Sequence, residues 1–220
     1  MKMTRSVIAS LAMMLISVSL IYGQDLSKYR DFTLGASLAD VSKQVDKRPT
    51  DAIVVHERPV LIQQLTWWPS RIVNSSLRGE AVQEIRFSFY NGELYRMEVT
   101  YDNASTRGFT PEDMVRAMAA SYGTPTALVG EIKNNYGTTE KVLARWEDSQ
   151  YLFNLYRSSL SNSFRVAVFM KELNTQAEAA SVEATILEAQ EGRTKELARV
   201  KQASDDLETA RQKNVKAFHP

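Results

Sequence analysis

Cysteine is missing from all 220 residues of the chain. Its absence excludes disulfide bonds, thiol catalysis, zinc sites with cysteine ligands and a lipid-modified N-terminal cysteine. Histidine is almost as scarce, with only His56 and His219. The 27 Lys and Arg residues nearly balance the 26 Asp and Glu residues, so the charge gives no indication of nucleic-acid binding or of a strongly anionic partner.

The residue patterns of catalysis and metal binding are also missing. His56 stands beside Glu57, but no G-x-S-x-G segment supplies a nucleophile for a Ser-His-acid triad. His219 is the penultimate residue, where fraying makes a poor general base. The chain has no H-E-x-x-H pattern, no EF-hand loop and no glycine-rich phosphate loop. We therefore predict a protein that is not an enzyme, with no catalytic residue, no cofactor and no metal ligand.

The longest apolar run lies at the start of the chain. Two basic residues precede an apolar segment from Val7 to Ile21, and polar residues follow. This order predicts a signal peptide over residues 1–24, cleaved near Gly23 or Gln24. An uncleaved anchor is the alternative, although the run is short against the ~20 residues of a membrane span. We expect an exported protein, periplasmic or secreted, without a membrane span in its mature chain.

The strongest local signal lies in residues 82–101, where two alternating segments flank the Asn-Gly pair at 91–92. Such a pair is typical of a tight β-hairpin. A two-residue loop would set Phe87 opposite Arg96, an apolar residue opposite a charged one. A three-residue loop sets Phe87 opposite Tyr95, and we predict this register because a slip by one residue reverses every side chain. The hairpin is expected at the centre of an antiparallel sheet with one buried face.

Helix and strand signals recur on both sides of the hairpin. Ser37 is placed to cap a short helix from Leu38, and Thr110 with Pro111 is placed to start a second helix that ends at Gly123. Strands are predicted at residues 53–56, 60–67, 142–146, 151–156 and 164–170, and loops at 70–80 and 130–139. A helix followed by strands thus occurs twice, which predicts an α+β domain over 25–172, built from two helix-then-antiparallel-strand units at about 25–108 and 109–172.

Residues 173–220 form a tail of different composition. Ala, Glu, Lys, Arg and Gln dominate it, and all favour helices. Gly192 interrupts the phase between two apolar stripes, so we predict either one long helix or a helical hairpin. Because the stripes are thin, such a helix needs to pack on its own sheet, on itself or in a coiled coil with another chain. The first stripe contains Val182, Ile186 and Ala189, and the second contains Leu197, Val200, Ala203, Leu207 and Ala210.

Trp67 and Trp68 are candidates for a surface anchor. Adjacent residues of a strand face opposite sides of a sheet, so at most one of them joins the same core. The other is covered by the tail or exposed as an anchor for a partner, since aromatic residues are enriched at binding hot spots. The predicted protein-binding residues are therefore Trp67, Trp68, Leu197, Val200 and Leu207.

Three segments carry a resemblance to known families: DFTLGASLADVSKQV, FSFYNGELYRMEVTY and FTPEDMVRAMAASYGTP. Their short helix after a glycine and their x-N-G-x-L turn resemble the small outer-membrane assembly lipoproteins of the SmpA/OmlA (BamE-like) group. They also resemble the β-lactamase inhibitor protein, which is similar to a tandem of that unit. The likeness covers residues 31–170 and implies a fold of α/β modules and a non-catalytic, protein-binding class. The lipobox cysteine and the inhibitor's disulfides are absent, and no contact residue carries over.

The predicted function is that of an exported, envelope-associated protein that binds another protein. Self-association through the tail is included in this prediction. The alternative function is inhibition of a secreted hydrolase. A less favoured alternative is that the protein is itself a hydrolase, with two catalytic carboxylates that are distant in the sequence and adjacent in the fold.

Overall fold

The computed structural model of the chain describes residues 25–69, 81–128, 130–134 and 137–219. The predicted signal peptide with its cleavage site and the predicted loop at 70–80 lie outside the described residues.

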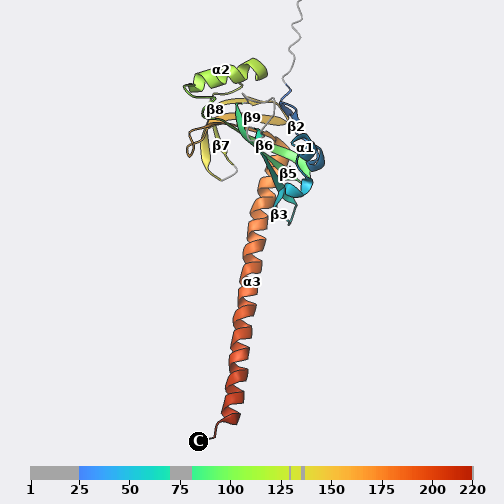
Figure 1. Ribbon diagram of the computed structural model, residues 1–220, viewed down its shortest axis with the longest axis vertical. Helices are drawn as coiled ribbons and strands as arrows, with labels where there is room; N and C mark the ends of the chain where they lie inside the picture. Colours follow the sequence, from blue (N-terminus) through green and yellow to red (C-terminus); the bar gives the residue numbers. More distant parts are fainter. Residues whose placement is uncertain (1–24, 70–80, 129, 135–136, 220) are drawn as a thin grey trace, which may run out of the picture.

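An antiparallel sheet of eight strands forms the body of the molecule, in the order β3-β4-β5-β6-β10-β9-β8-β7 (Figure 1). The strands are β3 (Ile53–His56), β4 (Ile62–Trp67), β5 (Val82–Tyr90), β6 (Glu93–Tyr101), β7 (Gly130–Lys133), β8 (Thr139–Glu147), β9 (Tyr151–Arg157) and β10 (Phe164–Met170). A small sheet pairs β1 (Lys28–Tyr29) with β2 (Phe32–Thr33). The helical elements are α1 (Leu38–Gln44), the 3₁₀ turn η1 (Pro49–Asp51), α2 (Pro111–Tyr122) and α3 (Lys171–Ala217). The predicted α+β class, with a sheet-based domain and a long C-terminal helix, is confirmed.

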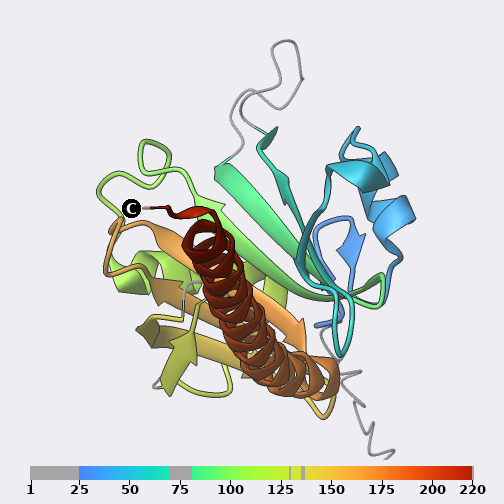
Figure 2. The ribbon, with the colours of Figure 1, turned by 90° about the horizontal axis from the view of Figure 1, so that it is seen from below.

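The two faces of the sheet have different covers. On the first face the main hydrophobic core packs alternate strand residues such as Phe87 and Phe153 against Val41 of α1 and Met114 of α2. Helix α3 lies on the second face, opposite α2 (Figures 1 and 2). The period-two alternation of the strands therefore separates a core face from a face that receives the C-terminal helix.

The β5–β6 hairpin differs from its predicted register. Asn91 and Gly92 adopt φ angles of 50° and 83°, and they form a two-residue loop closed by the strand ends. The predicted three-residue loop is therefore wrong. The extra residue is instead Tyr95, inserted in β6 as a bulge, so Phe87 pairs with Met97 rather than with Tyr95. The bulge keeps Phe87 and Met97 on the core face and turns Tyr95 toward α3.

The predicted helix starts are confirmed. The Ser37 hydroxyl accepts a hydrogen bond from the Asp40 amide at 3.1 Å. Thr110 and Asp113 form a reciprocal capping box at the start of α2. Gly123 ends α2 with a φ of 65°, a conformation that costs glycine little.

The finer division into two helix-then-strand units fits the structure poorly. A separate two-stranded sheet precedes α1, and one hydrophobic core extends over both expected units without a break at residue 108. Strand β7 occupies part of the predicted loop at 130–139, and β1 and β2 are two short strands in addition to the predicted ones. The described body is organised around one continuous sheet.

The tail forms one helix rather than a hairpin. Helix α3 runs for 47 residues and passes through Gly192 without interruption. Its first part packs on the sheet, whereas every described residue from Gly192 onward is exposed. Figure 1 shows this second part extending away from the body. We call residues 192–217 the arm.

Candidate protein-binding site

The docked part of α3 is held by small residues that bring the helix close to the sheet. Ala177 and Ala180 pack with Ile62 of β4 and Tyr95 of β6. Ala184, which is 1% exposed, follows on the same side of the helix. The Tyr95 bulge thus has a direct consequence, because it supplies one of the aromatic surfaces on which α3 rests.

Edge strand β3 adds polar contacts to this junction. His56 Nδ1 lies 3.3 Å from Glu188 Oε1, and Arg58 Nη2 donates to Glu191 Oε1 at 2.6 Å. These four side chains line a cavity of about 330 Å³ between β3 and α3. The structure therefore places His56 in contact with the C-terminal helix, an arrangement that its position in the sequence does not indicate.

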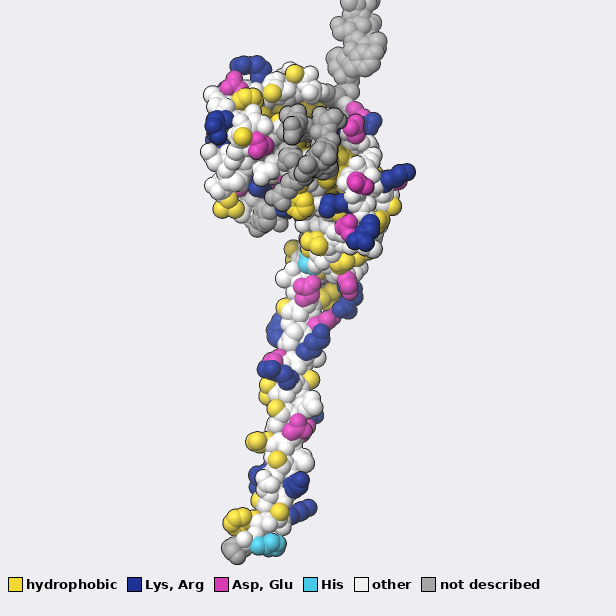
Figure 3. Space-filling model, in the orientation of Figure 1, with side chains coloured by type: hydrophobic (Ala, Val, Ile, Leu, Met, Phe, Trp, Pro, Cys, Tyr) yellow, Lys and Arg dark blue, Asp and Glu magenta, His cyan; other side chains and the backbone are white. Residues whose placement is uncertain are grey.

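The opposite face of α3 carries larger apolar side chains. Val182 and Ile186 are each two positions from Ala184, which is about 200° around the helix, so they point away from the sheet. On the arm, Leu197 and Leu207 are 71% and 75% exposed. Hydrophobic side chains appear along the arm between charged ones in Figure 3. The set of large exposed apolar residues on α3 is Val182, Ile186, Leu197, Val200, Leu207 and Val215.

We predict that substitutions on the two faces of α3 differ sharply in their effect on stability. Ala184→Asp places a charge against the sheet and should lower the free energy of unfolding by about 2–3 kcal/mol. Leu197→Asp changes an exposed position and should alter it by less than about 0.5 kcal/mol. Urea denaturation followed by tryptophan fluorescence measures both. Equal losses in the two variants would contradict this division of the helix.

Trp67 and Trp68 are both partly buried and make different contacts. The Trp67 ring packs edge-on against Phe32 at 5.6 Å between ring centroids, on the core face. Trp68 donates from Nε1 to Glu84 Oε2 at 3.1 Å, and the Lys47 ammonium lies 5.6 Å from its ring centre. These contacts hold both rings within the body of the domain.

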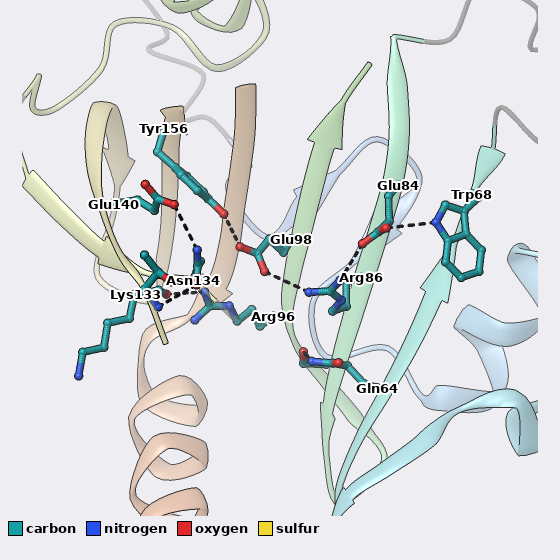
Figure 4. Close-up of polar contacts among 12 residues, drawn as sticks. Gln64, Trp68, Glu84, Arg86, Arg96, Glu98, Lys133, Asn134, Glu140 and Tyr156 are labelled. Carbon is teal, nitrogen blue, oxygen red and sulfur yellow. Dashed lines mark hydrogen bonds and ion pairs between the residues drawn. The ribbon is translucent and has the colours of Figure 1, made fainter. Parts of the chain in front are cut away.

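A chain of charged contacts leads from Trp68 across the second face of the sheet (Figure 4). Arg86 Nη2 donates to Glu84 Oε1 at 2.9 Å, and its Nη1 lies 4.0 Å from Glu98 Oε2. The Tyr156 hydroxyl donates to the other oxygen of Glu98. Burial and the nearby Glu98 carboxylate raise the pKa of Tyr156 well above its usual value. The phenol therefore stays protonated as a hydrogen-bond donor.

Arg96 connects this polar region to α3. Its Nη1 donates to Asn174 Oδ1 at 3.3 Å, and its Nη2 donates to the Lys133 carbonyl at 2.9 Å. Its guanidinium lies 5.5 Å from the centre of the Phe169 ring. These contacts attach the base of α3 to β6 and to the end of β7.

Residues 27–177 match the family model of the TP0088 domain. The chain belongs to the TP0088 domain family. The matched segment includes the sheet and ends within the docked part of α3, so the arm follows the TP0088 domain. No curated protein matches the chain.

A search of solved structures found a similar chain in the crystal structure of a cysteine-rich secretory protein (SAV1118) from Staphylococcus aureus subsp. aureus Mu50. The two share 9% sequence identity with a TM-score of 0.32, and the match covers 64% of this chain. This chain spans 44% of the length of that chain. The likeness is too low to carry an argument, and the resemblance to the SmpA/OmlA group and the β-lactamase inhibitor protein stays a prediction.

The predicted binding residues lie in two places. Trp67 and Trp68 belong to the TP0088 domain, whereas Leu197, Val200 and Leu207 lie on the arm. Within the described ranges no helix is long and apolar enough to cross a membrane. The same ranges contain no group of three or more potential metal ligands. The arm is the candidate binding site because its large apolar side chains are free of contact with the domain.

Proposed function

We propose that this chain is an exported, non-enzymatic protein that binds another protein through the arm. In this proposal the TP0088 domain anchors the base of the arm. The observation that carries the proposal is the exposure of Leu197, Val200 and Leu207 on one helix. Large apolar side chains on an exposed helix are a common recognition element, in which the apolar face lies in a groove or on another helix.

The rest of the arm supports a role in association. Its own side chains stabilise the helix locally, as in the Arg211–Glu208 pair at 2.7 Å and the Arg199–Glu196 pair at 3.0 Å. Exposed pairs of this kind add little to stability, because water and salt screen them. Burial of the apolar stripe by a partner would add about 25 cal/mol for each Å² removed from water. The arm therefore gains most of its stability by being bound.

The proposed binding is tested by capture from cell-envelope extracts with two matched triple variants of the full-length chain. Leu197→Asp/Val200→Asp/Leu207→Asp changes the stripe, and we expect it to lose the captured proteins. The control places three aspartates on the other side of the arm, at Ala198, Gln202 and Thr209, and should retain them. Circular dichroism checks that both variants keep the helix.

Retention of every captured protein by the stripe variant would contradict the proposal. Capture of a secreted hydrolase that survives the stripe substitutions would instead favour the alternative, an inhibitor that acts through the surface of the TP0088 domain.

A further inference from the structure

The exposed face of α3 carries a regular repeat. From Ala179 to Ala217, positions on this face recur in alternating steps of three and four residues, the spacing of a coiled-coil seam. All of these positions are exposed in the single chain. Most hold Ala, Val, Ile or Leu. Arg193 and Glu196 occupy two successive seam positions near the middle, and Asn214 occupies one near the C-terminal end.

This seam lies away from the docking contacts. Val182 and Ile186 belong to it, and both point to the side of α3 opposite Ala184 and the sheet. A second helix could therefore lie along the seam without displacing the TP0088 domain. The seam from Ala179 to Ala210 contains 32 residues and is about 48 Å long at the 1.5 Å rise of an α-helix. It is therefore longer than four heptads of seven residues, whereas three to four heptads are enough to indicate a coiled coil.

We propose that the occupant of the seam is the same seam of a second copy of this chain, running antiparallel. The inference rests on the proposed function and specifies its partner. Seam charges decide the direction. A two-fold axis between Arg193 and Glu196 sets Arg193 of each copy opposite Glu196 of the other. A parallel pair would set Arg193 against Arg193 and Glu196 against Glu196, and such like-charge contacts oppose association.

The apolar positions fit the same register. With the axis between Arg193 and Glu196, Ala189 meets Val200 of the second copy and Ile186 meets Ala203. A small residue thus stands opposite a larger one in both layers, which keeps the spacing of the helices even. A parallel pair would alternate Ile186–Ile186 and Ala189–Ala189 layers of unequal width.

The even spacing is confined to the two layers beside the charges. Further along the seam, Val182 meets Leu207 and Ala179 meets Ala210, so these layers differ in width but remain apolar. On one flank, Glu178 comes beside Lys213 of the second copy, an attractive pair. Arg193 itself forms no ion pair with any residue in the described part of the chain. The antiparallel dimer gives it a carboxylate partner.

The absence of native cysteine makes the direction directly testable in the full-length chain. Ala189→Cys and Val200→Cys chains are treated with a short bismaleimide cross-linker, singly and as an equimolar mixture. We expect cross-linked dimers in the mixture and not in either variant alone, because the two thiols of an Ala189→Cys dimer would lie about 16 Å apart along an antiparallel pair. Ala198→Cys, on the other side of the arm, controls for random encounters. Strong cross-linking of Ala189→Cys alone would overturn the antiparallel register.

Charge exchange provides a second readout by sedimentation equilibrium. Arg193→Glu should weaken dimerisation by about tenfold or more, because it creates two Glu–Glu contacts. Arg193→Glu/Glu196→Arg should restore it, whereas a parallel pair would show no rescue. A monomeric wild-type chain at high micromolar concentration would overturn self-pairing. If stripe-dependent capture of another protein persists in that case, the proposed function stands and only the identity of its partner fails.

Discussion

Replacing Glu98 with alanine is expected to lower the free energy of unfolding by about 3–5 kcal/mol, the usual loss when one member of a buried charge pair is removed. The Glu98 side chain is 2% exposed, and its two oxygens face Tyr156 and Arg86. Its removal leaves the Arg86 guanidinium with one fewer carboxylate and the Tyr156 hydroxyl without this acceptor. The cost comes from desolvated groups that lose their partners, rather than from the strength of the original contacts.

Urea denaturation of Glu98→Ala beside Glu131→Ala measures this effect. Glu131 is exposed on β7, so its variant should stay within about 0.5 kcal/mol of the wild type. Tyr156→Phe removes one donor to Glu98 and should cost about 1–2 kcal/mol. A Glu98→Ala loss no larger than that of Glu131→Ala would show that the charged contacts of the second face contribute little to stability.

Trp146→Ala should have an effect of similar size, about 3–5 kcal/mol, because it empties a large site in the main core. Trp146 is 1% exposed, and its ring meets Phe153 edge-on with centroids 6.4 Å apart. Its Nε1 donates to the Gly123 carbonyl at 2.8 Å, which fixes the C-terminal end of α2 on β8. The substitution therefore removes both packing and the attachment of a helix.

A phenylalanine at the same position separates these two contributions. Trp146→Phe keeps much of the apolar volume and loses the hydrogen bond to Gly123, so a loss of about 1–2 kcal/mol is expected in the same denaturation experiment. If Trp146→Ala and Trp146→Phe cost the same, the hydrogen bond rather than the packing would hold α2.

Local signals in the sequence predict much of this fold. Ser37, Thr110 and Gly123 mark helix ends through the conformations and hydrogen bonds that their side chains allow, and the structure uses them in this way. Alternation predicts the strands of the hairpin. Because side chains alternate between the two faces of a strand, the sequence also shows that the hairpin needs one extra residue to keep Phe87 and Met97 on the same face. The alternation does not show at which position of the hairpin this residue is inserted. The structure inserts Tyr95 in β6, where α3 can use its ring.

Features that depend on distant partners are not visible in the sequence. Glu98 alternates with apolar residues, as on a solvated strand face, and only the pairing of β5, β6, β9 and β10 brings Arg86 and Tyr156 beside it. The sequence also does not show where α3 leaves the sheet, because this point depends on contacts between the helix and distant strands. Alanines dominate the docked face and recur on the arm, so composition does not distinguish them.

The arm as an association surface is tested most directly by hydrogen–deuterium exchange on the full-length chain at high concentration. We predict that amides of residues 192–217 are protected in the wild type and exchange rapidly in Val200→Asp/Leu207→Asp. Residues 82–101, in the centre of the sheet, should be protected equally in both proteins. Rapid and identical exchange of the arm in the two proteins would contradict the account.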